Sequence, residues 1–443
     1  MRKKNVITIL LFILCFNIRL DGINPVFRNK LYSSEEDKSI SLSNDKSTSA
    51  EWYSIWGGSE EEYCADMVIG PSENIYLVGN TGSFGAGGTD MFLLKFNSTG
   101  EILWNRTWGG IDYDECNAIA LDSSENIYLA GTTQSYGAGS TDMCLVKFSN
   151  DGNYIWNKTW GGVSSEYCRD IEFDQSGNIY LAGDGGNDMC LVKFDHNGNY
   201  LWNKTFGGTR SEGCNDLGID LHGNFYLAGY IYPGGQPGPD IHLIKLNRDA
   251  EYQLNKTWGG NDGGTCESIT IDAVNNVYLC GRFYEDDMSN SFVMKYSTLN
   301  LVQWNYTWKV LDESFCTDIT LDSSEFIYIT GMAIDNDSEE INSYIYKFGY
   351  LGEVLWKCII KGENREMAMC IELDAMDNIY IGGLIISNIS THDYDIFLMK
   401  NPKPTTKDAI AGYSILLISI LISSIAMIIV VKECFRKKKS HHF

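Results

Sequence analysis

Positive charge is scarce in this chain. Its 443 residues include 34 Lys and Arg against 58 Asp and Glu, a formal net charge of −24. Basic residues gather at the two ends, in residues 1–22 and 432–443, so the body between them holds 25 basic and 56 acidic residues. A surface of that sign repels a phosphate backbone and offers no basic stripe for counterion release. Nucleic-acid binding is therefore excluded.

Proline and histidine are also rare, with 7 and 6 residues, whereas glycine is abundant at 44. Hydrophobic residues make up 44 % of the chain, which is typical of a globular protein with a real core. The sequence contains no HExxH motif, no P-loop and no nucleophile elbow. We therefore expect a protein that is not an enzyme and that needs no cofactor.

Two hydrophobic runs indicate where the chain resides. Arg2-Lys3-Lys4 precedes the 11 apolar residues 6–16, a length typical of a signal peptide, so we expect 1–22 to be a signal peptide or an uncleaved anchor. Residues 23–51 are a polar linker. The 23 residues 409–431 carry no charge, which predicts a transmembrane helix after a short juxtamembrane linker, 401–408. The basic tail 432–443 is then cytoplasmic by the positive-inside rule, and the body is extracellular.

Between these ends one unit is repeated. The sequence Trp-Asn-Arg-Thr-Trp-Gly-Gly at 104–110 recurs, with small changes, at 156–162, 202–208 and 254–260. Weaker copies begin at Trp52, Trp304 and Trp356. A fixed period near 50 residues, held through seven copies, indicates a repeat architecture.

Each copy predicts four short strands. In the second copy they are 117–121, 127–130 (closed by Gly131), 143–148 and 154–160, separated by turns rich in Asp, Asn and Gly. Four short strands in about 50 residues are typical of a propeller blade, so we predict an all-β, seven-bladed β-propeller over 52–400. The chain enters at Trp52 with an outermost strand and leaves after a third strand. Residues 52–56 should therefore complete the last blade and close the ring.

The repeated motifs resemble a known family. Trp-Gly-Gly, Asp-x-x-x-Asn-Ile-Tyr-Leu-x-Gly and Asp-Met-x-Leu-x-Lys-Phe recur across 52–400. In these features the chain is similar to the SBBP family, the seven-bladed β-propeller repeats of archaeal and bacterial surface proteins. The resemblance implies the fold and a surface location, and it says little about activity.

Acidic residues precede each predicted first strand. Two positions ahead of an aligned cysteine column stand five carboxylates, Glu62, Asp114, Glu166, Glu212 and Glu366. Around one mouth of the ring they would hold a cation, with calcium the candidate, or a basic ligand, and mutual repulsion would raise their pKa values when nothing is bound. The alternative is a solvated loop copied by duplication.

Cysteines and glycosylation sequons also follow the repeat. The cysteine column (Cys64, Cys116, Cys168, Cys214, Cys266 and Cys316) predicts small buried side chains between blades rather than disulfides or metal ligands. Eight Asn-x-Ser/Thr sequons are candidate glycosylation sites, namely Asn97, Asn105, Asn157, Asn203, Asn255, Asn305, Asn336 and Asn388. Five of them share one place on the outermost strand.

These observations favour a membrane-anchored extracellular propeller that serves ligand binding, adhesion or surface display without catalysis. Its partners would be the membrane and an extracellular protein or glycan. Two alternatives stay open from the sequence: a propeller enzyme of quinoprotein or lyase type, and an architectural component of the cell envelope.

Overall fold

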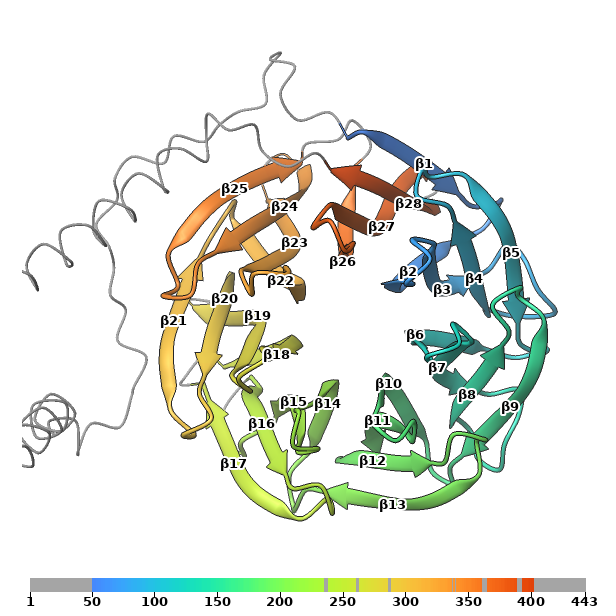
Figure 1. Cartoon of the computed structure of the whole chain (residues 1–443), viewed down its shortest axis with the longest axis horizontal. Helices are drawn as coiled ribbons and strands as arrows, with labels where there is room; N and C mark the ends of the chain where they lie inside the picture. Colours follow the sequence, from blue (N-terminus) through green and yellow to red (C-terminus); the bar gives the residue numbers. More distant parts are fainter. Residues whose placement is uncertain are drawn as a thin grey trace, which may run out of the picture. The chain divides into compact units, whose positions relative to one another are not determined.

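The computed structural model describes residues 50–401 except 235–237, 260–262, 286–287, 337, 339, 361–364 and 389–392. In this part of the chain 28 strands form seven four-stranded antiparallel sheets, which stand as blades around a central channel (Figure 1). No helix among the described residues is long and apolar enough to cross a membrane. The predicted signal peptide, the basic tail and the transmembrane segment 409–431 lie outside the described residues.

Each blade runs from an innermost to an outermost strand in chain order. The first is β2 (Glu62–Ile69), β3 (Ile75–Thr81), β4 (Asp90–Phe96) and β5 (Ile102–Trp108), and the second is β6 (Asp114–Leu121), β7 (Ile127–Thr133), β8 (Asp142–Phe148) and β9 (Tyr154–Trp160). The third is β10 (Glu166–Phe173), β11 (Ile179–Gly185), β12 (Asp188–Phe194) and β13 (Tyr200–Phe206), and the fourth is β14 (Glu212–Ile219), β15 (Phe225–Ile231), β16 (Asp240–Leu246) and β17 (Tyr252–Trp258). The fifth is β18 (Gly264–Ile271), β19 (Val277–Glu285), β20 (Met288–Tyr296) and β21 (Val302–Trp308), and the sixth is β22 (Glu313–Leu321), β23 (Ile327–Asp335), β24 (Glu340–Phe348) and β25 (Val354–Ile360). The seventh is β26 (Met367–Leu373), β27 (Ile379–Asn388), β28 (Asp393–Asn401) and the N-terminal strand β1 (Trp52–Trp56).

The predicted closure of the ring is confirmed. Strand β1 pairs antiparallel with β28, from Trp52 opposite Lys400 to Trp56 opposite Ile396. The Trp56 ring then packs on Phe84 and Phe92 of the first blade, at centroid distances of 5.1 and 4.9 Å. Strand β1 thus pairs with the seventh blade and packs on the first blade. Because β1 covers the outer edge of β28, that edge is not left unpaired.

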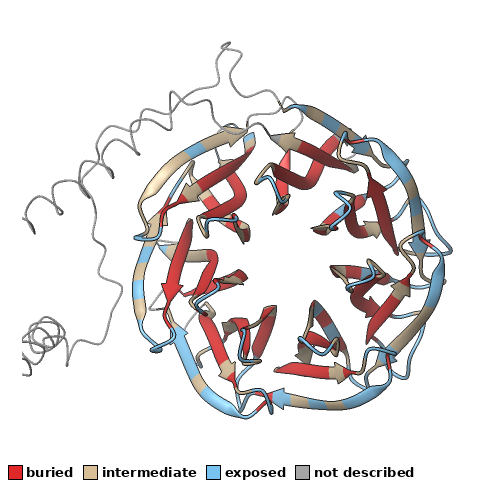
Figure 2. Cartoon of the chain, viewed as in Figure 1, coloured by how far each residue is buried: buried red, intermediate tan, exposed pale blue. Residues whose placement is uncertain are grey.

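Burial follows the position of a strand within its blade. Side chains of the second and third strands are almost all buried, because neighbouring blades cover both faces, whereas the outermost strands alternate between half-buried and exposed (Figure 2). The Asp-x-x-x-Asn-Ile-Tyr motif closes the turn between the first two strands. In the second blade Asp122 accepts hydrogen bonds from the backbone N–H of Ser124 and Asn126 and from the Tyr128 hydroxyl. The motif is therefore a local folding unit.

The strands are longer than the sequence predicts. Strand β7 continues past Gly131, the residue expected to end it, because Gly131 pairs with both Cys116 and Cys144. A Cβ at Gly131 would overlap the carbonyl oxygen of Glu115. This glycine therefore allows close approach within a sheet and does not form a turn.

The six predicted column cysteines are buried and free, as expected. In six of the blades a β-bulge directly follows the column cysteine, between Cys64 and Asp66 in the first, and in the seventh it follows Ala368. A bulge inserts one residue and re-aims the side chains that follow it. That change of direction sets the lining of the channel.

Candidate functional site

The five carboxylates predicted to ring a mouth lie at or just before the start of the innermost strands, and they are buried. Glu62 and Asp114 have no exposed area, and Glu166, Glu212 and Glu366 are 8–9 % exposed. Glu62 accepts a hydrogen bond from the Gly58 N–H, and Asp114 accepts one from Gly110. Glu166 accepts the corresponding hydrogen bond from the Gly162 N–H, so three of the five side chains fold back onto the preceding Gly-Gly turn and do not form an exposed ring around the mouth.

Four of these carboxylates instead each lie beside an aspartate of the neighbouring blade. A Cβ on Gly109 would overlap Asp90 Oδ1 and lie 2.9 Å from Asp114 Oδ2, so both oxygens flank one point between blades one and two. Burial and the nearby Asp114 charge raise the pKa of Asp90. The same pairing recurs as Asp142 with Glu166, Asp188 with Glu212, and Asp395 with Glu62. The first glycine of the Trp-Gly-Gly motif is the residue that leaves room for the pair.

A second set of carboxyl groups, which the sequence analysis missed, lines the central channel. A cavity of about 560 Å³ inside the ring of innermost strands is lined by six of them: Asp66, Asp170, Glu172, Asp216, Asp318 and Glu372. None of the residues that line this cavity is Lys, Arg or His. Four of these aspartates, Asp66, Asp170, Asp216 and Asp318, also line an adjoining cavity of about 160 Å³ that contains one positive side chain, Arg169, so acidic groups outnumber basic ones in the channel.

The channel aspartates also connect adjacent blades. Asp66 accepts a hydrogen bond from the Ile119 N–H of the next innermost strand at 3.0 Å, and Asp216 accepts one from Ile269 at 2.7 Å. Asp170 and Asp318 make the corresponding bonds with the fourth and seventh blades. Each aspartate thus satisfies an N–H on the free inner edge of a neighbouring sheet.

Confinement raises the pKa values in the channel. Burial, with smaller contributions from the Asp318 and Asp216 charges, raises the pKa of Asp66 to about 7, and burial raises that of Asp318 to about 6. Burial and neighbouring carboxylates raise the pKa of Glu172 and of Glu372 to about 8. The channel therefore contains carboxyl groups that are protonated near neutral pH and would release protons to a competing cation.

Comparisons with known proteins agree with this architecture. A family model described as the SBBP β-propeller repeat matches residues 107–137, which run from the end of β5 to the loop after β7. That match falls on the unit that the ring repeats seven times. The chain is an SBBP-type seven-bladed β-propeller.

Other similarities to this SBBP propeller are more distant. The regulatory protein FlaEY of Caulobacter vibrioides is 24 % identical over 110 residues, which cover 22 % of this chain and 12 % of that protein. The Pan2 WD40 domain of Neurospora crassa superimposes with a TM-score of 0.50 at 9 % identity, covering 81 % of this chain and 97 % of that chain. A protein from Lactobacillus plantarum gives a TM-score of 0.47 at 14 % identity, over 69 % and 86 % of the two chains. At 9 % identity the likeness to the Pan2 domain concerns the fold alone.

The carboxyl groups of the channel belong to the chemical class of ligands that bind hard cations. Carboxylate oxygens are the preferred ligands of hard divalent ions, and a hydrated ion can be held through water rather than by a closed cage of side chains. The part of the chain that the structure describes contains no group of three or more His, Cys, Asp or Glu side chains arranged as a preformed metal site.

A signal for the channel is present in the repeat. Asp66, Asp170, Asp216 and Asp318 each stand two residues after the column cysteine, so they occupy one column of the alignment. Strict strand alternation would place them on the same face as the buried cysteine. The bulge removes that equivalence, which is why the pattern alone did not identify them.

The sequons of the SBBP propeller lie mainly on outermost strands. Asn105, Asn203, Asn255 and Asn305 are exposed there, and Asn157 is half-buried. The Tyr154 hydroxyl donates to Asn157 Oδ1 at 2.7 Å, and Tyr200 does the same to Asn203 at 2.6 Å. Asn97 lies in the turn after β4 and Asn336 in an exposed loop, whereas the side chain of Asn388 is outside the described set.

Proposed function

We propose that this propeller is a non-catalytic binding module, carried outside the cell on a single membrane anchor, and that it binds a cationic ligand in its central channel. The observation that carries the proposal is the convergence of six carboxyl groups on one cavity, against a single positive side chain, Arg169, in the lining of the adjoining cavity. A cation entering that space lowers the repulsion between the carboxylates and replaces protons held at raised pKa values.

The location outside the cell is supported by the sequence at both ends and by the sequons. Exposed amides on outermost strands are accessible to a glycosylating enzyme, and a glycan there would protect an exposed sheet edge. The uncharged segment 409–431 and the basic tail after it supply the anchor and its orientation.

Calcium titration of the full chain in detergent tests the channel. We expect Ca²⁺ binding by calorimetry and a rise in melting temperature, because a ligand at 100 times its Kd adds about 2.7 kcal/mol to stability. Binding should be weaker at pH 6 than at pH 8, since protons occupy Glu172 and Glu372 at the lower pH.

A double variant makes the test specific to the channel. Glu172→Gln with Glu372→Gln keeps side-chain size and removes two carboxylates, and it should weaken Ca²⁺ binding at least tenfold. Glu101→Gln, at an exposed outer turn, is the matched control and should bind as the parent does. Equal affinity in the double variant, or no bound metal in any protein, would reject a cation site in the channel.

A further inference from the structure

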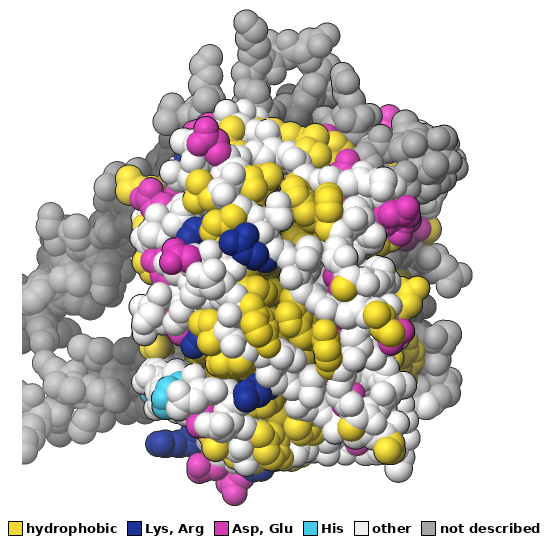
Figure 3. Space-filling model, turned by 90° about the vertical axis from the view of Figure 1, so that its right-hand side faces the viewer, with side chains coloured by type: hydrophobic (Ala, Val, Ile, Leu, Met, Phe, Trp, Pro, Cys, Tyr) yellow, Lys and Arg dark blue, Asp and Glu magenta, His cyan; other side chains and the backbone are white. Residues whose placement is uncertain are grey.

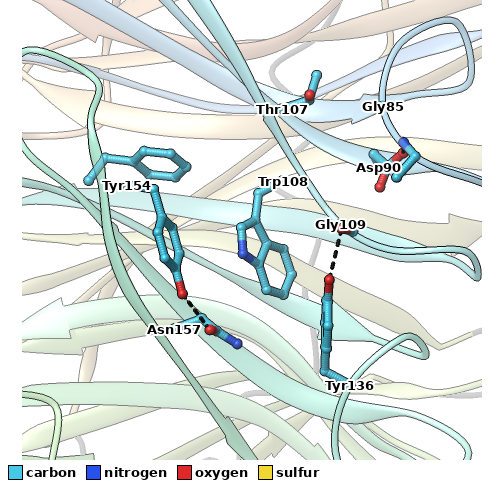
Figure 4. Close-up of a pocket in the computed structure, with 10 residues that line it drawn as sticks. Gly85, Asp90, Thr107, Trp108, Gly109, Tyr136, Tyr154 and Asn157 are labelled. Atoms are coloured by element: carbon cyan, nitrogen blue, oxygen red, sulfur yellow. Dashed lines mark hydrogen bonds between the residues drawn. The ribbon is translucent and has the colours of Figure 1, made fainter.

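A second cavity lies away from the channel, at the outer rim where the first and second blades meet. It has a volume of about 630 Å³ and is lined by the end of β5, the loop before β4 and the start of β9. Hydrophobic side chains gather in bands over this side of the molecule (Figure 3). Four aromatic residues, Trp108, Tyr136, Phe148 and Tyr154, contribute to its walls, and Figure 4 labels Trp108 and the two tyrosines.

These aromatic walls are held in place by the protein itself. The rings of Trp108 and Tyr136 are 5.2 Å apart, and the Tyr136 hydroxyl donates to the Gly109 carbonyl at 3.0 Å. On the other side Tyr154 meets Phe148 edge-on at 6.1 Å, and its hydroxyl is tied to Asn157. Because both walls are fixed without a ligand, binding between them would require little ordering of side chains.

A buried carboxyl group, that of Asp90, also lines the cavity and has no positive partner among the lining residues. Asp90, 1 % exposed, lines it, and its Oδ2 accepts hydrogen bonds from the N–H groups of Ala86 and Gly87 at 2.6 and 3.4 Å. Its Oδ1 is buried and accepts no hydrogen bond from the described residues. No Lys or Arg is among the residues that line the cavity. A buried carboxylate oxygen of this kind is costly unless a cation or a donor reaches it.

We propose that this cavity binds a quaternary ammonium group, with Trp108, Tyr136 and Tyr154 contacting the cation through their ring faces and Asp90 balancing its charge. Aromatic faces attract a diffuse cation electrostatically, most strongly the face of Trp. A primary ammonium is a poorer fit, because its three N–H donors each need an acceptor. A quaternary ammonium has no donors and suits a wall made of rings.

Two other blade junctions lack one part of this arrangement. At the junction of the seventh and first blades the rings of Trp56 and Phe84 are 5.1 Å apart and correspond to Trp108 and Tyr136. The opposite wall differs there, because Ile102 begins β5 at the position where Tyr154 begins β9. At the junction of the third and fourth blades Phe206 and Tyr252 touch at 5.3 Å, so the two walls close on each other.

Choline is the probe that tests the proposal, which concerns a different surface from the channel. Full-length protein in detergent is titrated with choline, with its neutral isostere 3,3-dimethylbutan-1-ol and with ethanolamine, following tryptophan fluorescence and calorimetry. We expect choline to bind at least tenfold more tightly than either comparison compound. Equal binding of the neutral isostere would overturn the proposal, since burial of methyl groups alone would then explain it.

Variants locate the site and separate it from effects on folding. Trp108→Ala should weaken choline binding at least tenfold, and Trp108→Phe, which keeps a ring, should weaken it less. Trp160→Ala is the matched control, because Trp160 ends β9 as Trp108 ends β5, whereas the third blade has only a short hairpin between β11 and β12 in place of the loop that holds Tyr136. Asp90→Asn should reduce binding of choline without changing that of the isostere. Similar losses in the Trp108 and Trp160 variants would place the ligand elsewhere.

A vesicle experiment distinguishes two sources of the same head group. Sedimentation with phosphatidylcholine vesicles, against vesicles of phosphatidylglycerol, shows whether the cavity takes a lipid head group. Binding of free choline without vesicle binding identifies a soluble ligand. Calcium binding to the channel is measured independently, so failure of either proposal leaves the other open to its own test.

Discussion

The carboxyl groups of the channel make stability depend on pH, and Asp66 gives the clearest case. Its pKa is about 7 in the folded protein against the usual 3.8, chiefly because of burial. The folded state therefore binds more protons than the unfolded state between these two values, and stability falls as pH rises through that window. From pH 5 to pH 8 this single group should cost about 2–3 kcal/mol.

The perturbation is Asp66→Asn. The amide keeps an oxygen that can accept the Ile119 N–H but carries no charge at any pH. Losing the second backbone hydrogen bond, which Asp66 Oδ1 accepts from the Met67 N–H at 2.7 Å, should cost about 1 kcal/mol at every pH, which shifts the curve without changing its slope. The variant should therefore be less stable than the parent at pH 5 and more stable at pH 8.

Urea unfolding at intervals from pH 5 to pH 8, in the absence of divalent cations, measures the two slopes. Asp112→Asn is the control, because Asp112 is an exposed aspartate on an outer turn. A variant curve parallel to the parental one would refute the reasoning, since Asp66 would then titrate alike in both states. A crossing of the two curves between pH 5 and pH 8 would support it.

Three further predictions concern the ring and its repeats. Trp56→Ala should cost about 2–4 kcal/mol in urea unfolding because it empties the contact across the closure, whereas Ile55→Ala, 51 % exposed on the same strand, should cost less than about 1 kcal/mol. Gly109→Ala should lower the melting temperature clearly, since its Cβ would overlap the buried carboxylate of Asp90. Gly162→Ala is the control and should change the melting temperature little, because no atom lies within 4 Å of the added Cβ. Equal shifts in the two variants would contradict the role assigned to the first glycine of the Trp-Gly-Gly motif. Burial alone would raise the pKa of Asp122, but hydrogen bonds from Asn126 and Ser124 outweigh burial and lower this pKa. The stability that the ionised Asp122 contributes should therefore be lost as pH falls below about 4. Asp122→Asn should flatten the acid limb of the plot of unfolding free energy against pH.

Much of the fold follows from local pattern. The period near 50 residues, the four runs in each copy and the phase of the repeat predict seven blades and a ring closed by residues 52–56, and the pairing of β1 with β28 bears this out. Strand ends were less well predicted. Gly131 looks like a turn residue, yet it lies inside β7 because it allows two strands to approach closely.

By itself the sequence determined the architecture, because the same alternation and turn chemistry is repeated often enough to leave one consistent arrangement. Only the tertiary structure decided which acidic side chains share a space. The bulge after each column residue turns Asp66 and its equivalents into the channel, while Glu62, Asp114 and Glu166, which the sequence places at an open mouth, fold onto Gly-Gly turns between blades. Proximity across blades depends on how separate sheets pack, and a one-residue change in strand register reverses the face on which a side chain lies.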